Sequence, residues 1–551
     1  MSLRPAPKGR AIDPRVLDEI RVLLGDAPRR PDLLIEHLHR IQDAFGHLTI
    51  AHLNALALDM SLAPAEVYEV ATFYHHFDVV RDGEAPPPAI TVRVCESVTC
   101  HLAGADDLLR ELQRALPADE VRVIPAPCVG RCDAAPVAVV GRNPVGYATP
   151  DAVAAAVSDN RTEPDRPAYT GYTDYRARGG YDILMSCVNG YRPIDDVLAA
   201  VEAAGLRGLG GAGFPAASKW KYVRAEPSPR VVVINADEGE PGTFKDRYCL
   251  ETDPHRVLEG MLITAWAVDA DDVFFYLRDE YAACRAILTG ELAELEARPP
   301  CRLPRIHIRR GAGAYICGEE SALIESIEGK RGEPRLRPPF PAQAGVYGLP
   351  TLVHNVESVF WLRDIIEFGG DAFLRRGGDG RRGVRFYSVS GRVARPGVYL
   401  AGNGITVREL IDRAGGMADG HTFHAYLPGG ASGGILPADL ADIPLEFGAL
   451  DEYGCFIGSA AIVILSDRDS VREVAHNLMR FFAHESCGKC TPCRVGTAKA
   501  EQLMRAPAWN LPVLDDLARV MSDASICGLG QAATNPLKSV RRFFPQELEQ
   551  P

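Results

Sequence analysis

The sequence has no run of about 20 consecutive apolar residues, the length that a helix needs to cross a bilayer. We therefore expect no membrane span. Residues 1–10 contain proline, lysine and arginine but no apolar core of the kind that secretory signals have. Without an export signal we expect a cytoplasmic protein, whose thiols stay reduced. The sequence also has no internal repeat and no low-complexity tract.

Positive charge is scarce relative to negative charge. The chain has 60 lysines and arginines against 73 aspartates and glutamates, a formal net charge of −13. Phosphate binding needs a basic surface, so nucleic acid is not expected as the main partner. Apolar residues make up 46% and charged residues 24%, which is ordinary for a globular protein. A length of 551 residues indicates several domains, about three to five.

Cysteine, by contrast, is abundant, with 14 in the chain. In a reducing compartment, clustered cysteines indicate metal binding rather than disulfides. Six of the 14 are scattered, and we interpret them as buried, inert thiols: Cys187, Cys249, Cys284, Cys301, Cys317 and Cys455.

One cysteine cluster lies in residues 485–497, which read ESCGKCTPCRVGT. Structural zinc sites usually take paired cysteines or histidines, whereas Cys487, Cys490 and Cys493 form a run of three. Three closely spaced thiolates can wrap a compact iron–sulfur cluster, which needs one further ligand from elsewhere. Cys527 lies in the same predicted helical region and is the candidate. A zinc site or incidental cysteines remain the alternatives.

The second cluster consists of two pairs, Cys95 with Cys100 and Cys128 with Cys132. Each pair is predicted at a strand end or in a loop, so the four thiolates could clamp a 2Fe–2S cluster, two per iron. Zinc is a serious alternative at this spacing. Gly130 makes a tight turn that would let backbone amides approach sulfur and tune the potential.

Local patterns divide the chain into five predicted domains: 1–85, 86–158, 159–380, 381–467 and 468–551. The first is helical and ends in a Gly/Pro-rich linker. Strands are predicted at 89–95, 121–124, 137–140, 230–234, 273–277, 384–390, 397–400 and 461–465. Helices are predicted within 13–80 and at 103–116, 194–204, 257–267, 280–296 and 406–414, with a helical C-terminal domain around the cysteine run. The alternation of strands and helices in the third domain is typical of a largely parallel sheet.

A glycine motif, GLGGAG, occupies residues 208–213 and matches the dinucleotide fingerprint. That fingerprint must follow a strand, whereas a helix is predicted before this motif, so we do not expect an ordinary Rossmann loop. The glycines still allow an anion or a ring to approach the backbone closely. Lys219 is placed to neutralise a phosphate, and Phe214 and Tyr222 could stack on a flat ring.

Two acidic motifs follow. Residues 235–240, NADEGE, come directly after a predicted buried strand, where ligands bind in open α/β sheets. They could hydrogen-bond ribityl or ribose hydroxyls, or form a solvated acidic loop. Residues 311–320, GAGAYICGEE, form a Gly-rich turn in which Glu319 and Glu320 are expected to meet hydroxyls or an amide. We expect Cys317, inside this turn, to be a packing residue.

These motifs together resemble a known family. GLRGLGGAGFPAASKW, NADEGEPGTFKDR, GAGAYICGEESALIESIEGKRGEPRLRPPFPAQAG and ESCGKCTPC look like the flavin-bearing, NADH-binding subunit of respiratory complex I and its soluble relatives. The resemblance covers residues 178–545. Residues 13–155 resemble the small 2Fe–2S subunit of the same complex, here fused to the flavin subunit. The implied fold is multidomain α/β: a helical bundle, a thioredoxin-like 2Fe–2S domain, a Rossmann-like FMN/NADH domain, a β-grasp domain and a helical 4Fe–4S bundle.

The resemblance implies roles for individual residues. The FMN phosphate and ribityl chain are expected to be lined by Gly208, Gly210, Gly211, Gly213 and Lys219, and the flavin to be followed by Asn235, Asp237 and Glu238. The flavin and nicotinamide are expected to face Tyr315, Gly318, Glu319 and Glu320. The adenine is expected between Phe214, Tyr222 and Phe340, with Glu240 on the nucleotide and Arg337 on its phosphates. The 4Fe–4S ligands are expected to be Cys487, Cys490, Cys493 and Cys527, and the 2Fe–2S ligands Cys95, Cys100, Cys128 and Cys132.

Some positions depart from the usual family pattern. Leu209 replaces a common arginine, and His354–Asn355 replaces an Asn–Asn pair near the flavin. GEPGTFKDR and LVHNVES look more like the diaphorase (beta) subunit of soluble NAD-dependent formate dehydrogenases that contain molybdenum or tungsten. Diaphorase subunits of NAD-reducing hydrogenases and complex I itself are the alternatives. The implied activity is electron transfer between NAD(H), FMN and the clusters, with formate oxidised on a partner alpha subunit that carries further iron–sulfur clusters. No protein acid or base is expected at the hydride.

A different class of function is a subunit that only wires electrons or assists assembly and binds no nicotinamide. The intact glycine and acidic motifs argue against it. NAD rather than NADP is expected, because Glu240 would repel a 2′-phosphate.

Overall fold

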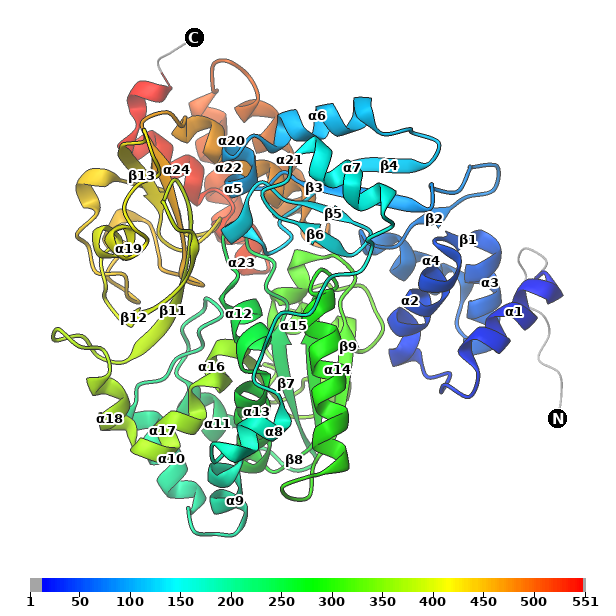
Figure 1. Ribbon diagram of the computed structural model, residues 1–551, viewed down its shortest axis with the longest axis vertical. Helices are drawn as coiled ribbons and strands as arrows, with labels where there is room; N and C mark the ends of the chain where they lie inside the picture. Colours follow the sequence, from blue (N-terminus) through cyan, green and yellow to red (C-terminus); the bar gives the residue numbers. More distant parts are fainter. Residues whose placement is uncertain (1–11, 549–551) are drawn as a thin grey trace.

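The computed structural model describes residues 12–548, which form a helical segment, a small mixed α/β segment, a central α/β segment, a mixed β-sheet segment and a C-terminal helical segment (Figure 1). Within this range, every helix is too short or too polar to traverse a lipid bilayer.

The N-terminal segment contains α1 (Pro14–Leu24), α2 (Leu34–Phe45), α3 (Ile50–Met60) and α4 (Pro64–Phe73). Side-chain oxygens of Asp13 and Thr49 accept hydrogen bonds from the first turns of α1 and α3, which fixes where these helices begin. The helices predicted in residues 13–80 are confirmed. A short parallel pair that the sequence did not indicate, β1 (Leu48–Thr49) and β2 (Val79–Val80), joins the connection between α2 and α3 to the end of the segment.

The second segment is a four-stranded sheet in the order β4-β3-β5-β6. Its strands are β3 (Ile90–Cys95), β4 (Val121–Ala126), β5 (Ala138–Val140) and β6 (Asn143–Val145), and its helices are α5 (Val98–Leu102), α6 (Ala105–Ala115) and α7 (Pro150–Ser158). Strands β3 and β4 are parallel and the other pairs are antiparallel. The alternation that predicted β3 is confirmed, since Val92 and Val94 are both buried. After α7, residues 159–171 run to the central segment as a largely exposed connection without a helix or strand.

The central segment is built on a fully parallel sheet in the order β10-β7-β8-β9. Its strands are β7 (Arg230–Ala236), β8 (Ala270–Leu277), β9 (Arg305–Arg310) and β10 (Thr351–Asn355). Val231 and Val233 face the core shared with the N-terminal and C-terminal helices, while Val232 and Ile234 face the other core. Both faces are therefore covered, as a parallel sheet requires, and the predicted parallel α/β domain is confirmed.

Helices cover this sheet directly or pack against the helices that do (Figure 1). They are α8 (Tyr172–Ala177), α9 (Asp182–Val188), α10 (Ile194–Ala203), α11 (Ala216–Ala225), α12 (Lys245–Thr252), α13 (Pro254–Val268), α14 (Ala282–Ala297), α15 (Glu320–Ile327), α16 (Val356–Phe360), α17 (Leu362–Phe368) and α18 (Gly370–Arg375), with the 3-10 turn η3 (Tyr315–Gly318).

The fourth segment is a five-stranded sheet in the order β12-β11-β15-β13-β14, with one α-helix. The elements are β11 (Val384–Gly391), β12 (Gly397–Gly402), α19 (Val407–Arg413), β13 (Phe423–Leu427), β14 (Leu436–Pro437) and β15 (Ala461–Ser466). Three strands and the helix were predicted. β13 and β14 were missed, because β14 has two residues and β13 is buried only in its second half.

The C-terminal segment contains α20 (Val471–His484), α21 (Thr491–Met504), α22 (Leu511–Ala524), α23 (Gly528–Ala532) and α24 (Asn535–Phe543). Its apolar residues belong to the same core cluster as the N-terminal helices and one face of the central sheet. The N-terminal and C-terminal helices thus share one hydrophobic core with the central sheet.

A buried cation joins α12 to α16 in the central segment. Lys245 is fully buried, and its Nζ lies 2.8 Å from Asp246 Oδ1 and 3.0 Å from Glu357 Oε2. Buried charges are tolerated only when they are paired, so this lysine neutralises two carboxylates that would otherwise repel each other.

Replacing Lys245 should therefore destabilise the central segment. We expect Lys245→Met to lower its free energy of unfolding by about 3–5 kcal/mol, because two buried carboxylates lose their partner. The control is Lys221→Met, which removes a half-exposed ion pair with Glu202 and should cost no more than about 1 kcal/mol. Urea unfolding can be followed by tryptophan fluorescence, since three of the four tryptophans, Trp220, Trp266 and Trp361, lie in this segment. Equal unfolding midpoints for the two variants would contradict the assignment.

Candidate functional site

The glycine motif forms a loop between α10 and α11, so a helix precedes it as predicted. The loop is closed by two backbone hydrogen bonds, from Gly208 N to Phe214 O (2.9 Å) and from Gly213 N to Gly208 O (3.2 Å). Gly213 has φ +66°, and a Cβ there would lie 2.6 Å from the Phe447 ring. A Cβ on Gly210 would lie 3.2 Å from Asn355. Gly213 and Gly210 are therefore positions where the backbone is packed too closely for a larger residue to fit without a shift.

Two asparagines mark the carboxyl edge of the central sheet. Asn235 and Asn355 are register partners at the ends of β7 and β10. Asn235 Nδ2 donates to Gly318 O at 2.9 Å, which holds the first acidic motif against the second. The glycine loop, the NADEGE motif and the GEE motif, far apart in sequence, thus meet at the edge where α/β sheets bind ligands.

Carboxylates and cations pair next to this edge. Glu319 caps α15 by accepting hydrogen bonds from two backbone N–H groups. Glu320 lies 3.2 Å from Lys219 Nζ and 3.1 Å from Arg337 Nη2, and Arg337 also pairs with Glu319. The two cations that the resemblance places at phosphates are therefore assembled together, with their charge balanced by the two glutamates.

Three aromatic side chains predicted to contact adenine are exposed: Phe214 at 42%, Tyr222 at 59% and Phe340 at 51%. The centroids of the Phe214 and Tyr222 rings lie 6.3 Å apart. Large exposed rings such as these offer stacking surfaces for a planar group.

Two predicted residues turn their side chains elsewhere. Glu238 is buried and caps α12: its Oε1 accepts from Asp246 N at 2.8 Å, and its Oε2 accepts from Tyr281 OH at 2.8 Å. The expectation that its side chain follows the flavin does not fit this arrangement, because the free N–H groups at the start of α12 take the carboxylate. His354 is also buried, and its Nε2 accepts from Trp220 Nε1 at 2.6 Å. Burial lowers the pKa of His354 to about 3, so the ring is neutral. Its hydrogen bond with Trp220 connects it to α11.

The remaining predicted residues link the site to other segments. Glu240 Oε1 accepts from Ser432 N at 2.9 Å, so the fourth segment holds this carboxylate in place. Tyr315 packs on Phe481 of α20, with ring centroids 5.0 Å apart. Asp237 Oδ2 is buried without a hydrogen-bond partner, and burial raises the pKa of this carboxyl well above its usual value.

Sequence reasoning missed Arg278, which is buried at the end of β8. Its guanidinium donates to Cys128 O at 2.7 Å and to Glu238 O, and it pairs with Glu280 at 2.7 Å. The signal that could have found it is its place directly after a predicted strand, the same rule that singled out Asn235. Its contact with Cys128 is long-range and leaves no trace in the sequence.

One group of thiols is buried between the second and central segments. Cys95 ends β3, Cys100 lies in α5, and Cys128 and Cys132 follow β4. The Cys128 and Cys132 sulfurs lie 3.5 Å apart, and the neighbouring thiols of Cys100 and Cys128 raise the pKa of Cys95 well above its usual value. Phe244 of the central segment packs against the group. The four thiols are assembled as predicted, and four converging sulfurs suit either a 2Fe–2S cluster or zinc.

The second thiol group lies in the C-terminal segment. Cys487, Cys490, Cys493 and Cys527 line a single cavity together with Ile316. Cys490 and Cys527 are the N-cap residues of α21 and α23. Cys527 therefore joins the run of three, as predicted. Ile316 comes from the GAGAYICGEE motif, so this cavity adjoins the flavin-type motifs.

The scattered cysteines behave largely as expected. Five of the six are buried, and Cys301 is half-buried. Cys317 is enclosed by Tyr74, Tyr276 and Ser326, and burial raises the pKa of its thiol above the usual value. It is a packing residue, as predicted.

Family models match four regions of the chain. Residues 20–161 match the thioredoxin-like [2Fe-2S] ferredoxin, and residues 201–364 match the Nuo51 FMN-binding domain. Residues 386–436 match the SLBB domain, and residues 473–551 match the NADH-ubiquinone oxidoreductase-F iron-sulfur binding region. The match of residues 20–161 favours a 2Fe–2S cluster over zinc for the four buried thiols of the second segment.

Similar proteins cover the flavin-type part of the chain. An NADH-quinone oxidoreductase F subunit of Rhizobium meliloti is 40% identical over 392 residues, which cover 68% of this chain and 92% of that protein. The corresponding protein of Aquifex aeolicus is 37% identical over 399 residues, covering 70% and 92%. The mitochondrial 51 kDa subunit of Neurospora crassa NADH-ubiquinone oxidoreductase is 39% identical over 377 residues, covering 64% and 76%.

A solved structure covers both parts. A chain of an NAD+-reducing [NiFe]-hydrogenase in the H2-reduced state superposes with a TM-score of 0.82 at 32% identity, covering 95% of this chain and 93% of that chain. The N-terminal and flavin-type segments therefore occur together in a solved homologue. With 40% identity over most of the length of the Rhizobium meliloti protein, the chain belongs to the family of the NADH-quinone oxidoreductase 51 kDa (F) subunits and contains binding regions for FMN, NAD, a 2Fe–2S cluster and a 4Fe–4S cluster.

Proposed function

We propose that this chain is a diaphorase module that transfers electrons between NAD(H) and a partner chain. The observation that carries the proposal is the short distance along η3 between two kinds of site. Gly318 O accepts a hydrogen bond from Asn235 at the carboxyl edge of the sheet, and Ile316, two residues earlier, lines the cavity of four thiols. The turn η3 therefore contacts both the candidate nucleotide site at the sheet edge and the cavity of the four cysteines.

The residues present fit the flavin. A Cβ would clash with the Phe447 ring at Gly213 and would be tight against Asn355 at Gly210, so a ligand can approach the bare backbone closely there. Lys219, which is paired with Glu320, supplies positive charge. We assign the FMN site to Gly208, Gly210, Gly211, Gly213, Lys219, Asn235, Asp237, Gly318 and Asn355. FMN, when bound, takes two electrons from NADH as a hydride and releases them one at a time.

The nicotinamide nucleotide is assigned to the exposed side of the same loop. Phe214, Tyr222 and Phe340 provide stacking surfaces, and Arg337 provides charge for the phosphates. Glu240 is fixed by Ser432 and would accept hydrogen bonds from ribose hydroxyls while repelling a 2′-phosphate, which favours NAD over NADP. The chain thereby orients the two reactants, and no side chain needs to move a proton at the hydride.

The thiol groups fit the clusters. We assign the 4Fe–4S ligands to Cys487, Cys490, Cys493 and Cys527, which surround one cavity. We assign the 2Fe–2S ligands to Cys95, Cys100, Cys128 and Cys132, which are all buried. Thiolates are the soft ligands that iron–sulfur clusters require.

For the partner, we propose a molybdenum- or tungsten-containing formate dehydrogenase alpha subunit with further iron–sulfur clusters, in the cytoplasm. The support is the GEPGTFKDR and LVHNVES variants, while the fusion of the small 2Fe–2S segment to the flavin segment disfavours complex I itself. A hydrogen-oxidising partner is the second candidate, because the similar chain of the NAD+-reducing [NiFe]-hydrogenase shares both fused segments.

The test is to purify the tagged chain anaerobically with whatever co-purifies. We expect bound FMN, NADH-dependent reduction of ferricyanide, and molybdenum or tungsten together with formate-dependent reduction of NAD+. If the purified chain contains no FMN and does not reduce ferricyanide with NADH, the proposed diaphorase function is refuted. Nickel with hydrogen-dependent activity would instead support the hydrogenase partner, and recovery with a membrane assembly would support a respiratory role.

Glu240→Ala should weaken NADH binding without loss of flavin. We expect KM for NADH to rise about 10- to 100-fold, because a charged hydrogen-bond acceptor is lost. The control is Ser432→Ala, which keeps the carboxylate but removes one of its supports, and it should change KM much less. Release of FMN from Glu240→Ala, or an unchanged KM, would show that the residue is misplaced.

Cys490→Ala should separate the two half-reactions. We expect NADH-dependent ferricyanide reduction to persist while reduction of the partner is lost, with the 4Fe–4S signal missing and the 2Fe–2S signal retained in electron paramagnetic resonance. Cys301→Ala, which removes a half-buried thiol outside both groups, should change neither activity. Circular dichroism checks that the helices remain folded. If Cys490→Ala still reduces the partner at the wild-type rate, electrons do not pass to the partner through the 4Fe–4S cluster, and the proposed route is wrong.

A further inference from the structure

A cavity of about 160 Å³ lies where the N-terminal, thioredoxin-like, flavin-binding and C-terminal segments meet. Its walls include His75, which follows α4, and His484 and Glu485, at the end of α20. One water needs only about 10–15 Å³ of such space, so the cavity has room for a cation and its water ligands. None of these three side chains belongs to the flavin or cluster assignments.

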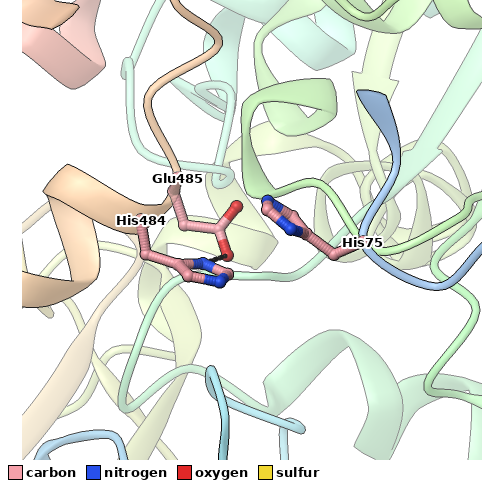
Figure 2. Close-up of side chains that lie close together, drawn as sticks. All are labelled: His75, His484 and Glu485. Atoms are coloured by element: carbon pink, nitrogen blue, oxygen red, sulfur yellow. Dashed lines mark hydrogen bonds and ion pairs between the residues drawn. The ribbon is translucent and has the colours of Figure 1, made fainter. Parts of the chain in front are cut away.

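The three side chains converge (Figure 2). Figure 2 shows the His75 ring approaching from one side and His484 with Glu485 from the other, and their ligand atoms all lie within 4.8 Å of one another. His484 Nδ1 and Glu485 Oε1 are 3.2 Å apart. Two ligand atoms of one tetrahedral Zn²⁺ ion are about 3.3 Å apart when each bond is about 2.0–2.1 Å long.

The backbone around the cluster is already ordered by its neighbours. Glu485 is 4% exposed, and its Oε2 accepts from Tyr315 N at 2.9 Å, which leaves Oε1 directed to His484. His75 N donates to Gly313 O at 3.2 Å, so the loop that carries this histidine is fixed to the flavin-binding segment. The rings of His75 and His484 are stacked, with centroids 4.3 Å apart. An imidazole nitrogen binds a metal in the plane of its ring, so one of the two rings has to rotate before both nitrogens face the same ion.

We propose that His75, His484 and Glu485 form a binding site for one divalent cation of the zinc type, with water completing the coordination. Two imidazoles and one carboxylate are a donor set that zinc accepts and that magnesium and calcium disfavour. The ion would connect the N-terminal helices to the loop that leads into Cys487. The proposal rests on these residues and does not depend on the identity of the partner.

The first test uses the wild-type chain with its flavin and clusters intact, titrated anaerobically with Zn²⁺ alone. We expect one tight equivalent per chain by elemental analysis after desalting. X-ray absorption at the zinc edge should show nitrogen and oxygen neighbours at about 2.0–2.1 Å and no sulfur at about 2.3 Å. A sulfur shell would place zinc on cluster cysteines and overturn the proposal, as would the absence of a retained equivalent.

The second test uses variants with unchanged flavin and iron content. His75→Ala and His484→Ala should each weaken Zn²⁺ binding at least about tenfold. The matched control is His476→Ala. His476 lies on the same helix and is also 3.2 Å from a glutamate, Glu501, but within residues 12–548 it belongs to no group of three possible ligands. Binding that survives in His75→Ala, or that is lost equally in the control, would refute the site.

Discussion

The arrangement of the molecule depends on one buried guanidinium, that of Arg278. A buried charge costs several kcal/mol unless its donors are satisfied, and this side chain has partners on three sides. It pairs with Glu280 on its own strand end, donates to the carbonyl of Glu238 in the NADEGE motif, and donates to the carbonyl of Cys128. These contacts can form together only if the thioredoxin-like segment is docked on the flavin-binding segment. The position of one cysteine group is thus tied to the acidic motif.

The C-terminal segment is tied to the same motifs from the other side. Glu485 accepts from the backbone of Tyr315, and Ile316 reaches the cavity of Cys487, Cys490, Cys493 and Cys527. The flavin-type edge of the sheet therefore lies between two thiol groups, one buried and one nearer the surface. This order follows from the contacts that Arg278 and Glu485 make with backbone groups of the two motifs.

Much of this architecture was predictable from local pattern. The β-branched run of β7 and the helix before the glycine loop were predicted from residue type and spacing. Cys527 was a candidate from its place in the same predicted helical region, and the family resemblance implied that it joins the run of three. The directions of single side chains were not. Glu238 and His354 lie in the expected motifs. However, the carboxylate of Glu238 accepts a hydrogen bond from the first turn of α12, and the ring of His354 accepts one from Trp220. Arg278 was missed because its partner Cys128 is 150 positions away, and contacts of that kind have no local signature.

The exposed connection at residues 159–171 has a consequence for assembly. The thioredoxin-like segment is already held by contacts that need no tether, such as Arg247 with Asp133 at 2.7 Å and Arg247 Nε with Gly130 O at 2.9 Å. A covalent link between segments that dock anyway raises their effective concentration without adding any contact. Its main effect is therefore stoichiometric: each flavin-binding segment is made with one thioredoxin-like segment, so neither has to find the other by diffusion.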